Sequence, residues 1–152
     1  LLVLALFFSV NLFAEYYKDV KVLKVIDGDT VYVKHSEKLF KLRLLNIDAP
    51  ELNQPFGEES YTYLKSLIDS KSVDIKTLKQ DRYERVLSTI YFKGKNINKL
   101  MVEKGLAWVY DDYVIDKSFY DDQKLAKKNK IGLWSDSNSI PPWLWRKKRP
   151  IK

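Results

Sequence analysis

Residues 20–45 read VKVLKVIDGDTVYVKHSEKLFKLRLL, and the alternation in this stretch decides the expected fold. Apolar residues recur at about every second position with lysines between them, which is typical of strands with one buried face. Two polar breaks interrupt the pattern, Asp27-Gly28 and His35-Ser36-Glu37-Lys38. The stretch therefore predicts three consecutive strands, around 20–25, 31–33 and 39–45.

The apolar period changes from two to that of a helix after this stretch. Residues 57–69 place Tyr61, Leu64, Leu67 and Ile68 on one helical face, and two glutamates stand in the first turn, where the helix dipole favours them. Two more strands are expected around 73–78 and 86–92.

Two short helices complete the expected pattern. One begins near Ile97 and is stopped by Gly105, and the other is capped by Ser118 with Asp121 and stops near Gly132. Five strands, with helices after the third and the fifth, predict an α+β domain built on a small barrel. Barrels of this kind often bind nucleic acid or sugar.

Composition limits the chemistry that is available. The chain has 152 residues, 27 Lys+Arg against 20 Asp+Glu for a formal net charge of +7, no cysteine and one histidine. The length fits a single domain, and 45% hydrophobic residues argue against a disordered basic tail. Disulfides, thiolate nucleophiles and cysteine-ligated zinc are excluded. Catalysis must come from carboxylates, Arg, Lys, Tyr or a hard metal ion, and the charge predicts a polyanionic partner.

The two ends of the chain differ from the domain expected over residues 15–136. Residues 1–14 hold twelve apolar side chains and no charge, so they are predicted to be a signal peptide with a truncated start; a retained anchor or a buried helix is the alternative. Residues 137–152 are expected to be an extension kept extended by its prolines, with Trp143 and Trp145 packed on the barrel. Its basic run, residues 146–149, either adds nonspecific phosphate contacts or stays unused in solvent.

Two carboxylates stand where a strand is expected to meet a loop. Asp29 lies in the turn Asp27-Gly28-Asp29-Thr30, and Asp48 follows the third strand. A closed barrel would bring them together as oxygen ligands for Ca²⁺ or Mg²⁺. Pro50 gives Ala49 an extended backbone, whose carbonyl is then available to a metal. The alternative for an Asp-Gly pair taken alone is an ordinary turn.

Five segments occur together in a recognisable order: VIDGDT (25–30), RLLNIDAPE (43–51), DRYERVL (81–87), GLA (105–107), and Lys127-Lys128 followed by GLW (132–134). In order and spacing they resemble the staphylococcal nuclease family, over about residues 20–134. The resemblance implies a five-stranded OB-fold barrel with three helices. It also implies a Ca²⁺-dependent nuclease that cleaves DNA and RNA, internally and from the ends, with little sequence specificity and leaves 3′-phosphate ends.

The resemblance assigns a role to each matching residue. Asp29, Asp48 and the backbone carbonyl of Ala49 are expected to hold Ca²⁺, while Arg43 and Arg85 hold the scissile phosphate. Glu51 is expected to position or deprotonate the attacking water, and Asp27 and Thr30 to orient the metal's water or the turn. Two guanidinium groups suit this reaction because they neutralise charge on the nonbridging oxygens without a proton transfer. In the alternative, Arg43 is only a surface residue and Arg85 only pairs with Glu84 or Asp81.

Three features after residue 80 each bear on how the chain would bind its substrate. Glu84 stands where the family usually has glycine, so the turn is expected to differ or to carry strain, and Glu84 would compete with phosphate for Arg85. Tyr110 and Tyr113 are possible stacking contacts for bases, with a core position as the alternative. Asp111-Asp112 either lie on a solvated face or weaken substrate binding from inside the groove.

The expected protein is a secreted or periplasmic monomer with DNA and RNA as substrates, Ca²⁺ as cofactor and no membrane association after signal cleavage. A noncatalytic nucleic-acid-binding OB module is the alternative from another class. Degenerate copies of that kind typically lose the carboxylates and arginines that this chain retains. A third reading, a membrane-tethered surface protein, requires that residues 1–14 stay attached.

Overall fold

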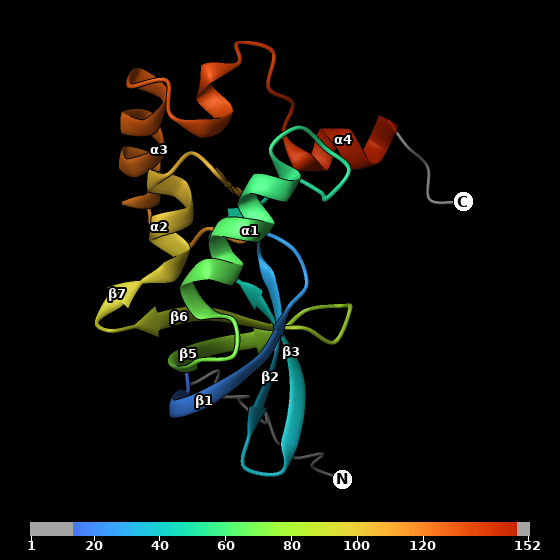
Figure 1. The fold of residues 1–152 in the computed structure, drawn as a ribbon, viewed down its shortest axis with the longest axis vertical. Coiled ribbons are helices and arrows are strands. Elements are labelled where there is room, and N and C mark those ends of the chain that lie inside the picture. Colours follow the sequence, from blue (N-terminus) through green and yellow to red (C-terminus); the bar gives the residue numbers. More distant parts are fainter. Residues whose placement is uncertain (1–13, 149–152) are drawn as a thin grey trace, which may run out of the picture.

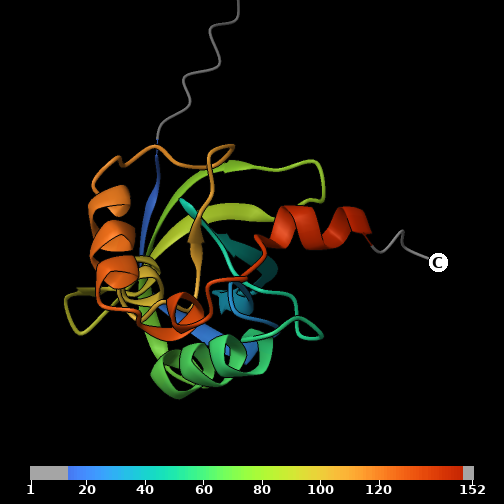
Figure 2. The ribbon, with the colours of Figure 1, turned by 90° about the horizontal axis from the view of Figure 1, so that it is seen from above.

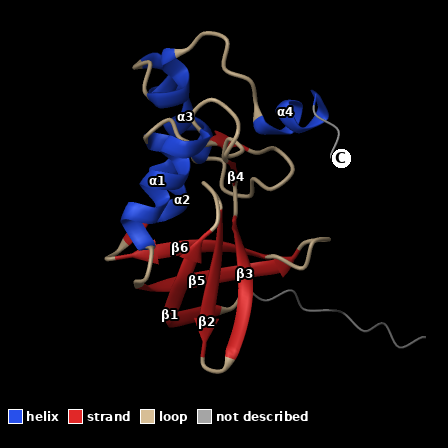
Figure 3. Cartoon of the chain, turned by 45° about the vertical axis from the view of Figure 1, so that its right-hand side comes forward, coloured by secondary structure: helices blue, strands red, loops and turns tan. Residues whose placement is uncertain are grey.

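The computed structural model describes residues 14–148, and five of its strands close into a barrel. These are β1 (Tyr16–Val25), β2 (Thr30–His35), β3 (Lys38–Leu44), β5 (Ser72–Gln80) and β6 (Val86–Phe92). Neighbours pair in the order β3-β2-β1-β5-β6, and a parallel pairing of β3 with β6 closes the ring. The predicted five-stranded α+β barrel is confirmed, and the helices gather at one end of it (Figure 1, Figure 3).

The alternation that predicted the strands reflects burial inside the barrel. Val20, Val22 and Val25 in β1 are all buried, although the last two stand three positions apart. The register of β1 against β2 shifts between Val22 and Lys24, as a β-bulge does. The extra residue restores the inward direction of Val25, which explains the break in the period-2 pattern.

Helix α1 (Gly57–Ile68) is confirmed in the predicted position. Leu64 and Ile68 are fully buried in the core beneath it, and Glu58 and Glu59 occupy its first turn. A Cβ at Gly57 would lie 1.9 Å from the carbonyl oxygen of Glu51. Glycine therefore lets the loop of residues 49–56 fold back onto the start of the helix.

Helices α2 (Ile97–Glu103) and α3 (Phe119–Lys128) also follow the prediction, with two corrections at α3. Ser118 does not cap α3 with its side chain, because its amide and hydroxyl both donate to Asp116 Oδ1, at 2.9 and 2.7 Å. The helix ends at Lys128, and the 3₁₀ turn η1 (Gly132–Ser135) follows it. Gly132 and Gly105 lie against each other's backbone, a contact that a Cβ at either position would block.

Other short elements lie outside the expected pattern. Strand β7 (Lys95–Asn96) extends the sheet beside β6, and β4 (Ile47–Asp48) pairs with β8 (Trp108–Val109) in a separate two-stranded sheet. Each is only two residues long, too short to show a period. The β4–β8 pair nevertheless places Asp48 against the segment that leads to Tyr110.

The expectation of an extended C-terminal segment is wrong, because residues Pro142–Lys148 form a fourth helix, α4. Pro142 stands at the first helical position, where its missing N–H leaves no hydrogen bond unmade. The helix lies apart from α1, α2 and α3, beside the loops at the end of the barrel (Figure 1, Figure 2).

Parts of two predicted segments lie outside the described residues. They are residues 1–13 of the expected signal peptide and the end of the basic run at Arg149. Within residues 14–148, no helix is long and apolar enough to cross a membrane.

Candidate active site

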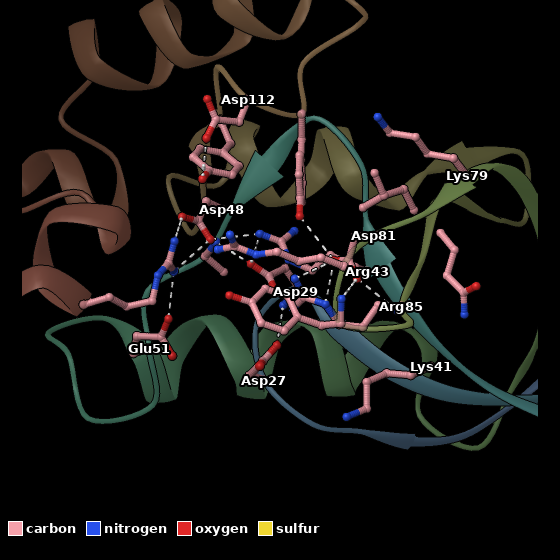
Figure 4. Close-up of a pocket in the computed structure, with 18 of the residues that line it drawn as sticks. Asp27, Asp29, Lys41, Arg43, Asp48, Glu51, Lys79, Asp81, Arg85 and Asp112 are labelled. Carbon is pink, nitrogen blue, oxygen red and sulfur yellow. Dashed lines mark hydrogen bonds and ion pairs between the residues drawn. The ribbon is translucent and has the colours of Figure 1, made fainter. Parts of the chain in front are cut away.

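A cleft of about 770 Å³ opens at the end of the barrel near the loops (Figure 4). All of the predicted site residues except Thr30 line it: Asp27, Asp29, Arg43, Asp48, Ala49, Glu51, Arg85, Tyr110 and Tyr113. Charged groups of both signs face one another across it: Asp27, Asp29, Asp48, Glu51, Asp81 and Asp112 with Lys41, Arg43, Lys79, Arg82, Arg85 and Arg146. The fold thus brings together residues from six separate segments of the chain.

Asp29 connects the turn after β1 to the end of β3. Its Oδ2 accepts the backbone N–H of Ala49 at 2.7 Å, and its Oδ1 accepts the Thr30 hydroxyl at 3.0 Å. Its backbone carbonyl accepts the amide of Leu44. The side chain of Asp29 is 8% exposed, and the hydrogen bonds to its two carboxylate oxygens hold it in place.

Asp27 supports this turn from the edge of the cleft. Its Oδ1 accepts the backbone N–H of Asp29 at 3.0 Å. Burial, and then the charge of Asp29, raise the pKa of Asp27 to about 7. Gly28 between them packs closely, since a Cβ there would lie 2.7 Å from that of Ala49. The turn is thus built against the loop that carries Ala49 and Glu51.

Arg43 is the central cation of the site. Its Nη2 lies 2.8 Å from Asp48 Oδ1 and 3.1 Å from Asp29 Oδ2, and its Nη1 donates to the carbonyls of Leu44 and Ile47. The residue is 3% exposed, so the alternative that Arg43 is a surface residue is wrong. Register places it opposite Thr30 on the neighbouring strand, which aims it at the turn.

Asp48 lies in the short strand β4 and is almost fully buried. Burial raises its pKa above the usual range against the attraction of Arg43, and the nearby charge of Asp29 raises it further. Two carboxylates with oxygens within hydrogen-bond distance of a single nitrogen repel each other. Such a pair is stable only with positive charge beside it.

Arg85 approaches from the loop between β5 and β6. Its Nε and Nη2 bind Asp81 Oδ2 at 2.9 and 2.8 Å, and the Tyr113 hydroxyl donates to the same oxygen at 3.2 Å. Of the two expected alternatives, Glu84 and Asp81, Arg85 therefore pairs with Asp81. Its Nη1 has no protein partner in the described part of the chain, and Arg85 lines the cleft.

Glu84 occupies the turn that the family usually fills with glycine. Its φ is 60°, in the left-handed region that favours glycine, so the expected strain is present. Its carboxylate forms no ion pair within residues 14–148, whereas Arg85 pairs with Asp81. The expected competition of Glu84 for Arg85 does not occur in this structure.

The two tyrosines lie together at the cleft. Their rings meet edge to face with centroids 5.1 Å apart, and Trp143 stacks on Tyr110 with ring centroids 5.5 Å apart. The Tyr110 hydroxyl donates to Asp112, and burial and this bond raise the pKa of Tyr110 to about 12. The Arg43 guanidinium carbon lies over the Tyr113 ring, 5.5 Å from the ring centroid. Trp143 therefore covers one ring face of Tyr110, whereas Tyr113 contacts Arg43 with its ring and Asp81, the partner of Arg85, with its hydroxyl.

Two charged contacts in the cleft have no local signature in the sequence. Asp81, one of the two alternative partners of Arg85, orients that arginine. Arg146 belongs to the basic run of residues 146–149, but it pairs with Asp48 and Glu51 at 2.8 Å. Asp112 also lines the cleft, so one member of the Asp111-Asp112 pair faces the groove.

The carboxylates at the centre suit a hard divalent cation by their chemistry. Within residues 14–148 no group of three or more Asp, Glu, His or Cys side chains surrounds a common point in metal-ligating geometry. Among the described residues, Asp29 Oδ1 and Asp48 Oδ2 each accept one hydrogen bond, so each keeps a lone pair for a further ligand. Two carboxylates and a backbone carbonyl match a cation that retains several waters.

Comparison with known proteins agrees with this geometry. The family described as "Staphylococcal nuclease homologue" matches residues 41–136. The chain is 43% identical over 130 residues to an Escherichia coli protein named "Uncharacterized endonuclease", which covers 85% of each chain. It is 36% identical over 138 residues to "Micrococcal nuclease" of Shigella flexneri, covering 84% of this chain and 79% of the relative.

A plant relative matches over a shorter part of its own length. "Staphylococcal-like nuclease CAN1" of Arabidopsis thaliana is 36% identical over 112 residues, 74% of this chain and 35% of the relative. The barrel, the arginine and carboxylate cleft and these matches agree. The chain belongs to the staphylococcal nuclease family, and it is a nuclease.

Proposed function

We propose that this nuclease hydrolyses phosphodiester bonds in DNA and RNA, internally and from the ends, with Ca²⁺ as cofactor, little sequence specificity and 3′-phosphate products. One observation carries the proposal: a buried arginine, Arg43, joins Asp29 and Asp48 in a cleft that also contains Arg85 and Glu51. Asp29, Asp48 and the carbonyl of Ala49 are the groups that would hold the ion. When bound, Ca²⁺ supplies positive charge that stabilises negative charge on the phosphate in the transition state.

The two arginines that line the cleft would bind the scissile phosphate. Arg85 offers its Nη1, while Asp81 holds the other edge of its guanidinium. Arg43 is oriented by the carbonyls of Leu44 and Ile47, so its position does not depend on the carboxylates alone. Guanidinium groups remain charged at any relevant pH and form charge-assisted hydrogen bonds with phosphate oxygens.

In this proposal Glu51 positions or deprotonates the attacking water. It lies in the loop 49–56 with its side chain 39% exposed, so water can reach it. Glu51 accepts a proton from the water as the water oxygen bonds to phosphorus and the bond from phosphorus to the 5′ oxygen breaks. The 5′ oxygen takes a proton from solvent, and the phosphate stays on the 3′ side.

Digestion of single-stranded DNA with Ca²⁺ or with EGTA tests this proposal, with wild type compared with Glu51→Ser. We expect Ca²⁺-dependent cleavage by wild type and a loss of at least about 100-fold in the variant. Substrates labelled at one end identify the terminal phosphate. If wild type fails to cleave with any divalent ion, the calcium-dependent mechanism is wrong and noncatalytic nucleic-acid binding replaces it.

We further propose that the protein is exported to the periplasm or the medium and acts as a monomer. The export part of this proposal rests on the apolar, uncharged composition of residues 1–14. N-terminal sequencing of protein from the native host is expected to start at Glu15. A chain that retains residues 1–14 in a membrane fraction would support the tethered form instead.

A further inference from the structure

Helix α4 is attached to the loop that carries Glu51. Gln54 Nε2 donates to the carbonyl of Ile140 at 2.6 Å, and Trp145 Nε1 donates to Asn53 Oδ1 at 3.3 Å. Pro142 between these two bonds is buried. One hydrogen bond precedes α4 and the other lies within it, so both hold the helix against the loop 49–56. The loop and the helix are far apart in the sequence.

An aromatic contact connects α4 to the segment behind Asp48. Trp143 stacks on Tyr110 at 5.5 Å and meets the edge of Trp108 at 5.8 Å. Trp108 is opposite Asp48 in the β4–β8 pair. Contacts of this size and geometry hold the helix in one orientation.

This orientation directs Arg146 into the cleft, which it lines. Its Nη2 binds Asp48 Oδ2 at 2.8 Å, and its Nη1 binds Glu51 Oε1 at 2.8 Å and Asp48 Oδ1 at 3.2 Å. One guanidinium thus joins a buried carboxylate to a half-exposed one. The planar guanidinium group gives such a bridge a fixed direction, whereas a lysine ammonium group would not.

Glu51 depends on this bridge. In the described part of the chain, Arg146 is the sole partner of its carboxylate. The other contacts of Glu51 are made by its backbone, which bonds to Gln54. A glutamate in a loop has several rotamers of similar energy, so removing Arg146 releases the carboxylate from its place beside Asp48.

The cleft remains open with Arg146 in its wall. About 770 Å³ is available while the arginine is bound to both carboxylates, and Asp48 Oδ2 accepts only one hydrogen bond from it. The arginine borders the reaction space without filling it. These observations favour a supporting role over a plug.

We propose that Arg146 is a positioning residue, which holds the Glu51 carboxylate at the site of hydrolysis by binding Asp48 and Glu51 together. The inference rests on the proposed role of Glu51. It extends the active site to a C-terminal helix outside the matched family region, residues 41–136.

Kinetics of Arg146→Gln test the proposal, with Lys147→Gln as the control. Lys147 is the next residue of the same helix, is exposed and does not line the cleft, so its replacement removes the same charge from the helix without touching the site. We expect Arg146→Gln to lower kcat by about 10-fold or more while KM changes less than about threefold. Arg146→Lys should recover part of kcat, and Lys147→Gln should change kcat by less than about twofold.

A double-mutant cycle with Glu51→Gln shows through which residue Arg146 acts. In a Glu51→Gln background, Arg146→Gln is expected to have almost no further effect on kcat. Independent, multiplicative effects would overturn the proposal. A rise in KM alone would overturn it in favour of a direct phosphate contact.

Calcium titration of the protein without substrate gives a readout that needs no turnover. Removing the positive charge beside Asp48 is expected to lower the Ca²⁺ Kd of Arg146→Gln severalfold, while kcat falls. If kcat rises as well, Arg146 blocks the site and the proposal is wrong. If Ca²⁺ affinity and kcat fall together with the thermal midpoint, the role is structural and the proposal is also wrong.

The two proposals fail in different ways. Absence of cleavage by wild type removes the proposed function and this inference with it. Normal cleavage by wild type, together with an unchanged kcat in Arg146→Gln, overturns the positioning role alone.

Discussion

Arg43 Nη2 lies 2.8 Å from Asp48 Oδ1, and both side chains are less than 5% exposed. The same nitrogen is 3.1 Å from Asp29 Oδ2, so one guanidinium carries much of the positive charge that keeps two buried carboxylates together. Arg43 therefore offsets part of the negative charge of these two carboxylates before any ion or phosphate enters the site. Its electrostatics depend on the shape of arginine as well as on its charge.

Arg43→Lys tests that dependence. A lysine retains the charge but cannot bind two carboxylates and two carbonyls at once. We expect kcat/KM to fall by at least about 100-fold and the free energy of unfolding by about 1–3 kcal/mol. Arg82→Lys makes the same exchange at the rim, where Arg82 lies over the Tyr83 ring, and should cost less than about threefold. Equal losses in both variants would contradict a special role for Arg43.

The Asp81–Arg85 pair predicts a defined pH dependence of stability. Burial alone would raise the pKa of Asp81, but hydrogen bonds from Arg85 and from the amide of Tyr83 lower it below the usual range. The stabilisation is thus complete above the unfolded pKa, ordinarily about 3.9, and is lost as the pH falls through the lower folded pKa.

Urea unfolding of wild type and Asp81→Asn over a pH series measures this effect. We expect wild type to be more stable at pH 7 and the difference to shrink below about pH 4. A difference that stays constant down to pH 2 would show that the charge of Asp81 does not contribute. Arg85→Gln should show the same convergence.

Glu84→Gly relieves a backbone conformation that glutamate adopts at a cost. The φ of 60° costs a non-glycine residue about 1–2 kcal/mol, part of which the greater freedom of unfolded glycine offsets. We expect unchanged or higher activity and a stability about 1 kcal/mol above that of Glu84→Ala, which removes the charge but keeps the strain. Nuclease assays and urea unfolding of both variants measure the two effects. A large loss of activity in Glu84→Gly would mean that Glu84 itself contributes to the site.

Gly57→Ala should disturb the loop that carries Glu51. The added Cβ would lie 1.9 Å from the carbonyl oxygen of Glu51, so the loop or the helix must move. We expect a fall in kcat of about 10-fold or more, because small displacements of a catalytic group are costly. Gly94→Ala is the matched control, since its Cβ meets nothing within 4 Å. At φ +74° it should lower stability by about 1 kcal/mol and leave kcat unchanged.

Much of the fold follows from local patterns in the sequence. Alternation predicted the five barrel strands, and helical spacing predicted α1 close to its observed bounds. The elements that the sequence did not predict are either very short or carry a local signal for another structure. Strands β4 and β8 have two residues each, and Pro141 and Pro142 suggested an extended segment, whereas Pro142 begins α4. Ser118 suggested a side-chain cap, but its hydroxyl found Asp116 instead.

The sequence by itself determined the barrel, the family and the motif residues that line the cleft, because each depends on short motifs or on a strand period that neighbouring residues share. Tertiary structure decided the partners of those residues. Arg146 binds Asp48, 98 positions away in the sequence, and Glu51, 95 positions away. No local sequence pattern indicates a contact over such a separation. Ion pairs between distant segments depend on how helices and loops pack, and here the packing of Trp143 on Tyr110 sets the direction of Arg146.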